Sequence, residues 1–126
     1  MLPVRERLLI LPIIGVLDRE RARQVTEQLL RGIRTHRAKV VVVDITGVPD
    51  VDEGVANHLV QTVDASRLMG ASVIITGLSP EIAQTLVTIG VDLSNLDTIG
   101  DLQGGLEEAE RLLGFSVSRT GEAGGT

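Results

Sequence analysis

The sequence of 126 residues contains no cysteine, no tryptophan and no tyrosine, and Phe115 is its single aromatic residue. The lack of cysteine excludes disulfides, thiolate metal sites and cysteine nucleophiles. The lack of aromatic rings argues against nucleic-acid modules that stack bases on aromatic side chains. The core must therefore be built from aliphatic side chains, and we expect no cofactor and no metal ion.

Basic residues are also scarce: 12 of them stand against 17 acidic residues, which gives a net charge of −5. An acidic surface repels phosphate backbones and anionic lipids, so we expect neither a nucleic acid nor a membrane as partner. The one basic run, within residues 19–39, is diluted by Glu20 and Glu27. We expect a cytoplasmic protein, a location with which the absence of cysteine is compatible.

One apolar run, residues 8–17, could be mistaken for a targeting signal. It is too short to span a bilayer, and charged residues follow it in place of a small-residue cleavage site. We therefore interpret it as a buried strand. Pro12 lies inside this run and indicates an edge strand or a bend, because proline cannot donate a ladder hydrogen bond.

Strand-like and helix-like patterns alternate along the chain. Apolar, β-branched runs predict strands at residues 8–16, 39–45, 72–76 and 97–99. Apolar residues spaced three and four apart predict helices at residues 18–35, 52–68, 80–89 and 101–113. This order predicts an α/β architecture with right-handed crossovers, and the apolar run at 39–45 predicts a strand buried on both faces.

The chain length fits one domain, which we place at residues 1–114. Residues 115–126 are small, polar and glycine-rich, and we expect them to form a flexible C-terminal tail. Within the last predicted helix, Gly104 and Gly105 indicate close packing against a neighbouring element. Asp18 and Ser79 are predicted N-caps, because their side-chain oxygens can accept the unpaired N–H groups of a first helical turn.

The richest segment for chemistry joins the second predicted strand to the second predicted helix, at residues 44–54. Open α/β sheets bind ligands at this edge. A metal site is one hypothesis, although the spacing of the carboxylates matches no calcium loop. Asp44 as the phosphoacceptor of a receiver domain is another, weakened because Lys39 is the only lysine. The plainer interpretation is that Asp52 caps the helix and Glu53 favours its dipole.

No catalytic constellation is visible. His36 and His58 are the only histidines, and neither accompanies a serine in a nucleophile motif. Phosphate-binding glycine loops are absent as well. By elimination, we expect no enzymatic activity and a binding or signalling module.

Three segments resemble the STAS domain, the fold of anti-sigma-factor antagonists, and more narrowly the stressosome scaffold proteins of the RsbR and RsbS type. They are residues 15–22 (GVLDRERA), 44–59 (DITGVPDVDEGVANHL) and 77–90 (GLSPEIAQTLVTIG). The resemblance implies a STAS fold, with a mixed, mostly parallel sheet of four to five strands. About four helices are implied on one side of it, with an extra first strand near residues 4–7. It also implies co-assembly with RsbS-like or RsbR-like proteins, or a homo-oligomer, and a serine/threonine kinase of the RsbT type.

The resemblance also locates two phosphoacceptor positions, which here hold Arg19 and Glu53, so both hydroxyls are missing. Three interpretations of Glu53 remain open: a native permanent charge, an engineered mimic of phosphate, and a mark of a branch without a phosphoswitch. Family analogy and location suggest four partner-binding residues: Asp18, Asp50, Asp52 and Asn57. The alternatives within the fold are a free anti-sigma-factor antagonist that binds an anti-sigma kinase, and a module for a small ligand or nucleotide. The resemblance leaves open whether the chain is a stand-alone protein or part of a longer one.

Overall fold

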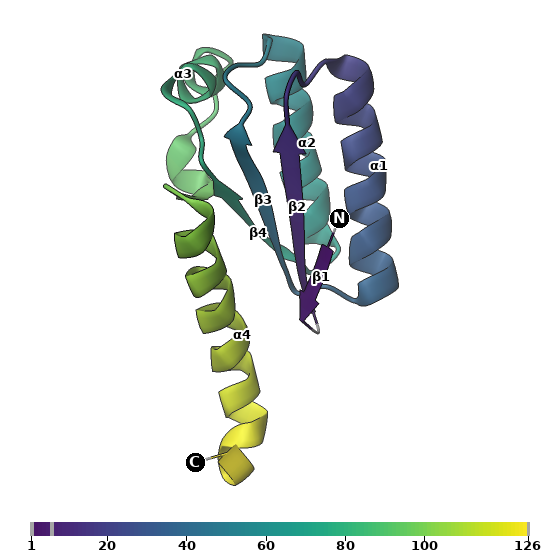
Figure 1. Ribbon diagram of the computed structural model, residues 1–126, viewed down its shortest axis with the longest axis vertical. Helices are drawn as coiled ribbons and strands as arrows, with labels where there is room; N and C mark the ends of the chain where they lie inside the picture. Colours follow the sequence, from purple (N-terminus) through teal and green to yellow (C-terminus); the bar gives the residue numbers. More distant parts are fainter. Residues whose placement is uncertain (1, 6, 126) are drawn as a thin grey trace.

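The computed structural model describes the backbone of residues 2–5 and 7–125 and the side chains of residues 7–114. Its centre is a five-stranded sheet in the order β1-β2-β3-β4-β5 (Figure 1). β1 is antiparallel to β2, and the remaining neighbours are parallel, so the predicted mixed, mostly parallel sheet is confirmed. The strands are β1 (Leu2–Arg5), β2 (Leu8–Ile14), β3 (Val40–Gly47), β4 (Ser72–Thr76) and β5 (Asp97–Ile99).

Four helices alternate with the strands, as the periodicity predicts. They are α1 (Arg19–His36), α2 (Glu53–Leu68), α3 (Pro80–Thr88) and α4 (Leu102–Gly125), and a short 3₁₀ turn (Leu93–Asn95) precedes β5. The helical backbone of α4 is longer than the predicted 101–113. The side chains of residues 115–126 lie outside the described residues, so the flexible tail stays a prediction.

The two faces of the sheet bury different residues because side chains alternate along each strand. Leu9, Val41 and Val73 point into a core shared with α1, α2 and α3. Their neighbours Leu8 and Val42 point into a second core beneath α4. The expectation that all the helices lie on one side of the sheet is therefore wrong for α4, which covers the opposite face. The reason is that β2, β3 and β4 are apolar on both faces, as predicted for residues 39–45, and each face needs a cover.

The path of α4 over its face depends on two glycines. A Cβ at Gly105 would lie 2.3 Å from Cγ2 of Thr76 on β4, and one at Gly104 would lie 2.8 Å from Cγ2 of Ile99 on β5. Real Cβ atoms do not approach so closely, so the absence of a side chain lets the helix pack directly on the strands. The predicted role of this glycine pair in close packing is confirmed.

Pro12 lies in β2 opposite Asp44 of β3, and the register shifts between Pro12 and Ile14. β1 pairs only with residues 8–10 of β2, so from Leu11 onward β2 forms an edge of the sheet. Proline is tolerated here because no strand on that side requires its missing N–H. The predicted edge position is therefore confirmed for the second half of β2, and the register shift marks an irregularity just after Pro12.

Candidate functional site

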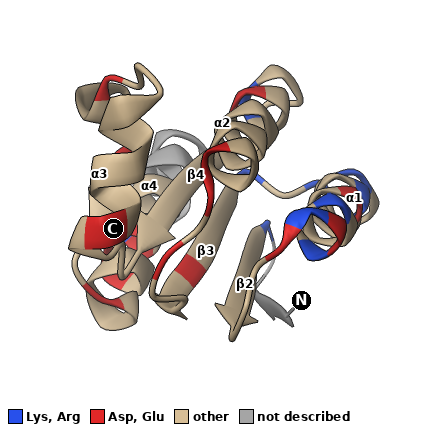
Figure 2. Ribbon diagram, turned by 90° about the horizontal axis from the view of Figure 1, so that it is seen from above, with Lys and Arg blue, Asp and Glu red and all other residues tan. Residues whose placement is uncertain are grey.

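The candidate site is the edge of the sheet at the carboxyl ends of the parallel strands, onto which Figure 2 looks. Two loops form it, one between β2 and α1 and one between β3 and α2. A backbone hydrogen bond of 3.3 Å from the Gly15 N–H to the Gly47 carbonyl joins the two loops. The fold thereby brings to one edge five of the six predicted site residues, Asp18, Arg19, Asp50, Asp52 and Glu53, and all five are exposed.

The two helices that begin at this edge are capped as predicted. Asp18 Oδ1 accepts a hydrogen bond of 2.8 Å from the Arg21 N–H, and Asp52 Oδ1 accepts one of 2.7 Å from the Val55 N–H. Each carboxylate satisfies one of the free donors of a first helical turn and lies at the positive end of the helix dipole. The predicted capping roles are confirmed, and any docking role of these residues is additional to them.

Arg19 connects the two helix starts. Its side chain covers Gly54, where a Cβ would lie 3.2 Å from Arg19 Nε and 3.2 Å from Nη2. Arg19 and Gly54 also border one shallow depression between α1 and α2, together with Ala22, Arg23, Val55 and His58. Glu53 immediately precedes Gly54, so the two positions that the resemblance assigns to phosphoacceptors belong to neighbouring parts of one surface. Asn57, the sixth predicted residue, is exposed one turn farther along α2.

Sequence reasoning missed the side chain that shapes the first loop. Nη1 of Arg21 donates to the carbonyl of Ile14 and, at 3.0 Å, to the carbonyl of Val16. A guanidinium carries several N–H donors in a fixed geometry, so one side chain can bind two backbone carbonyls of the same loop. No periodic pattern marks such a residue, because the contact depends on how the loop folds back onto α1.

Charge in the depression is partly balanced locally. Arg23 pairs with Glu20 at 2.6 Å and with Glu27 at 3.0 Å on the outer surface of α1. The hydrogen bond to Glu20 is the main cause that raises the pKa of Arg23. Arg23 thus forms ion pairs within its own helix, whereas the Arg19 side chain extends from α1 to Gly54 of α2.

His58 has a structural contact that explains its position. Its Nε2 lies 2.9 Å from Thr26 Oγ1 on α1, and Thr26 Oγ1 lies 2.6 Å from Thr62 Oγ1 on α2. Thr62 also donates to the His58 carbonyl at 2.9 Å. This polar bridge fixes the spacing of the two helices that carry the candidate site. His36, in contrast, is exposed at the end of α1.

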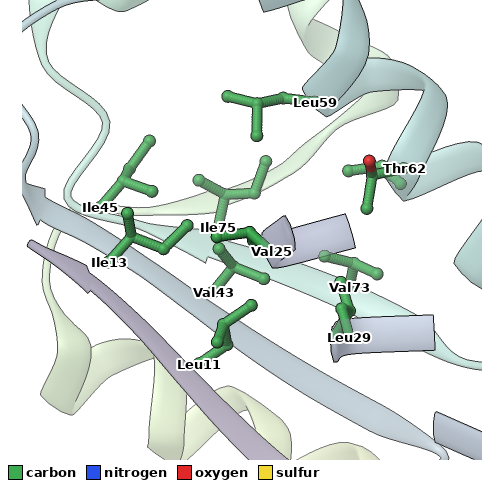
Figure 3. A pocket seen from close by; sticks show the side chains of 11 residues that line it. Leu11, Ile13, Val25, Leu29, Val43, Ile45, Leu59, Thr62, Val73 and Ile75 are labelled. Atoms are coloured by element: carbon green, nitrogen blue, oxygen red, sulfur yellow. The ribbon is translucent and has the colours of Figure 1, made fainter. Parts of the chain in front are cut away.

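Below this bridge the space between α1, α2 and the sheet is apolar (Figure 3). Leu29, Val43, Leu59 and Ile75 are among its lining residues, and Thr62 supplies the polar exception. The open space is about 30 Å³, whereas ligand pockets measure about 300–1,000 Å³. The cleft therefore gives no support to the small-ligand alternative.

Asp44 belongs to a different environment. It is half-buried on the α4 face of β3, and its Oδ1 accepts hydrogen bonds from Thr46 at 2.7 Å and from Thr76 at 2.8 Å. The described residues contain no group of three or more histidine and acidic side chains suited to a metal ion. The metal hypothesis gains no support from this arrangement, because a hard cation needs several oxygens together.

Comparison with known proteins gives a consistent family. The family model of the STAS domain matches residues 1–105. The RsbT co-antagonist protein RsbRA of Bacillus subtilis is 43% identical over 122 residues, a match that covers 97% of this chain and 44% of that protein. The chain thus spans less than half the length of this curated relative. None of the described helices is both long and apolar enough to cross a membrane.

Solved structures of stressosome proteins share the fold. RsbS of Moorella thermoacetica, in a variant with one serine replaced by glutamate, superimposes with a TM-score of 0.76 at 31% identity, covering 86% of this chain and 92% of that one. A chain from a structure of the stressosome, described as a signal integration and transduction hub, gives a TM-score of 0.75 at 29% identity, covering 86% and 95%. Sequence and fold agree, and the chain belongs to the STAS domain family, with close similarity to the RsbR and RsbS proteins of stressosomes.

Proposed function

We propose that this chain is a non-enzymatic scaffold module of a stressosome-like complex. It binds partner STAS domains and a serine/threonine kinase of the RsbT type, and through them it regulates a stress response. A cytoplasmic location is part of this proposal. The observation that carries it is the 43% identity to an RsbT co-antagonist over 97% of the chain.

The site geometry supports docking over catalysis. The polar side chains at the loop edge are occupied by backbone contacts: Asp18 and Asp52 cap helices, and Arg21 holds two carbonyls. His58 contacts a threonine on the neighbouring helix. A nucleophile needs a base within hydrogen-bond reach and a third group to orient that base, and these contacts supply no such set.

The replaced acceptor positions define how the proposed scaffold is switched. A phosphate at the start of α2 would add a charge of about −1.5 to −2, whereas Glu53 adds about one charge permanently. Arg19 places a cation beside it, over Gly54. We infer that the loop edge is held in one charged state, so that release or retention of the kinase depends on other STAS subunits that keep their hydroxyls.

Co-purification and light scattering test the proposal. The purified chain is mixed with an RsbS-like protein, with an RsbT-type kinase, and with an anti-sigma kinase as the competing partner. We expect particles much larger than either component with the RsbS-like protein, and retention of the RsbT-type kinase. Capture of the anti-sigma kinase alone would support a free anti-sigma-factor antagonist, and failure to bind any of these proteins would reject the scaffold.

A further inference from the structure

Charge is distributed unevenly along the chain. Nine of the 12 basic residues lie within residues 1–39, whereas 13 of the 17 acidic residues lie within residues 40–126. Four of these basic residues gather at one end of the sheet, and four of the acidic residues gather at the other. We call them the basic pole, at the amino ends of the parallel strands, and the acidic pole, at their carboxyl ends.

The basic pole contains Arg7, Arg34, Arg37 and Lys39. With Ile33, Ala38 and Met69 they line an open groove below the ends of α1 and α2. Backbone hydrogen bonds hold the segments together: the Lys39 N–H donates to the Arg7 carbonyl at 2.9 Å, and the Ser72 N–H donates to the Lys39 carbonyl at 2.8 Å. Within residues 7–114 none of the four cations forms an ion pair.

The acidic pole is the loop edge with Asp18, Asp50, Asp52 and Glu53. Of the three nearest arginines, Arg23 is paired with Glu20 and Glu27 of its own helix, which leaves Arg19 and Arg21 to offset the four carboxylates. Ser79 Oγ donates to the Pro49 carbonyl at 2.8 Å and so ties the loop before Asp50 to the start of α3. This hydrogen bond helps to hold the loop of the acidic pole in place.

Helix dipoles explain only part of this pattern. Acids at helix starts and bases at helix ends stabilise α1 and α2 themselves. Arg7 and Lys39, however, lie outside any helix, in the turn before β2 and in the connection to β3. Dipoles also leave unexplained why both poles expose large apolar side chains.

Those apolar groups are placed in pairs. Ile14 and Val16 are 71% and 80% exposed at the acidic pole. Leu68 and Met69 are 89% and 44% exposed at the end of α2, where Met69 borders the basic groove. An interface core needs such groups beside its charged rim, and each pole supplies both.

We propose that the basic pole of one copy docks onto the acidic pole of a second copy of this chain, in a head-to-tail contact. Opposite charges orient the two surfaces, and the exposed apolar pairs are removed from water between them. Because the two surfaces differ, one copy can bind a neighbour at each end, which produces a ring or an open array. The inference deepens the proposed scaffold function and rests on it, since it names the surfaces through which the scaffold grows.

Charge reversal at one pole at a time tests the contact. The basic-pole variant carries Arg34→Glu with Lys39→Glu, and the acidic-pole variant carries Asp50→Lys with Glu53→Lys. A control variant, Arg31→Glu with Arg111→Glu, makes the same change in net charge as the basic-pole variant at two exposed arginines that do not line the basic groove. Sedimentation velocity over a concentration series measures self-association, and circular dichroism verifies that each variant is folded.

We expect the wild type and the control variant to form oligomers at low salt that dissociate at about 1 M salt, where the Debye length is about 3 Å. Each pole variant should self-associate at least about tenfold more weakly. An equimolar mixture of the two pole variants should associate again, because each partner retains the intact pole that the other one has lost. Isothermal titration of one variant into the other should give a stoichiometry of about one.

Pole variants that associate like the wild type, or a mixture that stays monomeric, would overturn the head-to-tail contact. So would a basic pole that binds an acidic peptide or an anionic vesicle while the wild type stays monomeric. If an RsbS-like partner is still retained in these cases, the scaffold function stands and only this contact fails. If the wild type neither self-associates nor retains that partner, the proposed function fails as well.

Discussion

The guanidinium of Arg19 on α1 lies over Gly54 of α2, close enough that a Cβ at residue 54 would be 3.2 Å from Nε. The two residues thus form a matched pair, in which a long cation covers a position with no side chain. The pair joins the starts of both helices at the proposed docking edge. It also places a positive charge over the residue that follows Glu53, a position that we propose to correspond to a phosphoacceptor.

Gly54→Ala should stabilise the fold slightly. Alanine is favoured over glycine in a helix by up to about 1 kcal/mol, and the atoms it meets belong to the flexible end of Arg19. We expect an increase of roughly 0.5 kcal/mol in the free energy of unfolding by urea denaturation. The same change in an Arg19→Ala background should stabilise more. If Gly54→Ala in the otherwise wild-type protein lowers the free energy of unfolding by more than about 1 kcal/mol, the Arg19 guanidinium cannot move away from the new Cβ.

Glu53→Ser should restore phosphorylation by an RsbT-type kinase. The serine would follow the N-cap Asp52, where the free N–H groups of the first turn tolerate a phosphate. Incorporation of labelled phosphate measures the effect. Gln61→Ser is the matched control, because it creates an exposed hydroxyl on the same helix, outside the predicted partner-binding residues, and should stay unlabelled. Absence of label in both Glu53→Ser and Glu53→Thr, with a labelled relative in parallel, would contradict a retained kinase site.

Gly105→Ala should destabilise the fold by about 1–3 kcal/mol. The new Cβ would lie 2.3 Å from Cγ2 of Thr76, so α4 must move away from the sheet. Gly114→Ala in the same helix is the control, because its Cβ would meet nothing within 4 Å. Thr76→Ser removes the clashing methyl group and retains the hydroxyl that donates to Asp44, so it should recover part of the loss. Equal effects of the changes at 105 and 114 in urea denaturation would disprove the close approach.

Thr62→Val should weaken the bridge between α1 and α2. The substitution removes the hydroxyl that lies 2.6 Å from Thr26 and donates to the His58 carbonyl. We expect the free energy of unfolding to fall by about 1 kcal/mol. Thr62→Ser keeps the hydroxyl and provides the comparison for its loss. If Thr62→Val is as stable as the wild type, the hydroxyl contacts do not hold the two helices together.

The Glu108 carboxyl should titrate below the usual range of glutamate. The hydrogen bond from Arg111 is the main cause that lowers its pKa. A carboxyl with a lowered pKa in the folded state contributes stability at higher pH, and this contribution disappears as the pH falls through its folded pKa. Carbon-detected NMR titration should show the lowered pKa in the wild type and a return toward the ordinary value in Arg111→Gln. If the pKa of Glu108 is unchanged in that variant, the hydrogen bond from Arg111 is not the cause of the lowered pKa.

Local signals predicted most of the fold. Strand β4 and strand β5 have the predicted bounds, and the caps Asp18, Asp52 and Ser79 accept the expected N–H groups. These features depend on a few neighbouring residues, so a single sequence contains them. The side of the sheet covered by α4 did not follow from the resemblance, although the apolar run in β3 indicated that both faces were buried.

The candidate site was predicted as a location and not as a set of contacts. Its acids, together with Arg19 and Glu53, lie at the expected edge, because parallel strands bring their carboxyl ends together. The lean of Arg19 over Gly54 and the grip of Arg21 on the first loop depend on long, flexible side chains crossing between segments. No spacing rule in the sequence encodes such contacts, and the same holds for the two poles.

One helix shields an entire face of the sheet, and this has a consequence for handling the protein. Residues such as Leu8, Ile10, Val42 and Ile74 are kept from water on that face by α4. A shortened chain that ends before this helix would retain its loop edge and its three other helices. It would, however, expose the whole aliphatic face of the sheet to water. Such a truncated protein would aggregate while its strands are still folded. It would therefore be unsuitable for measurements of specific assembly.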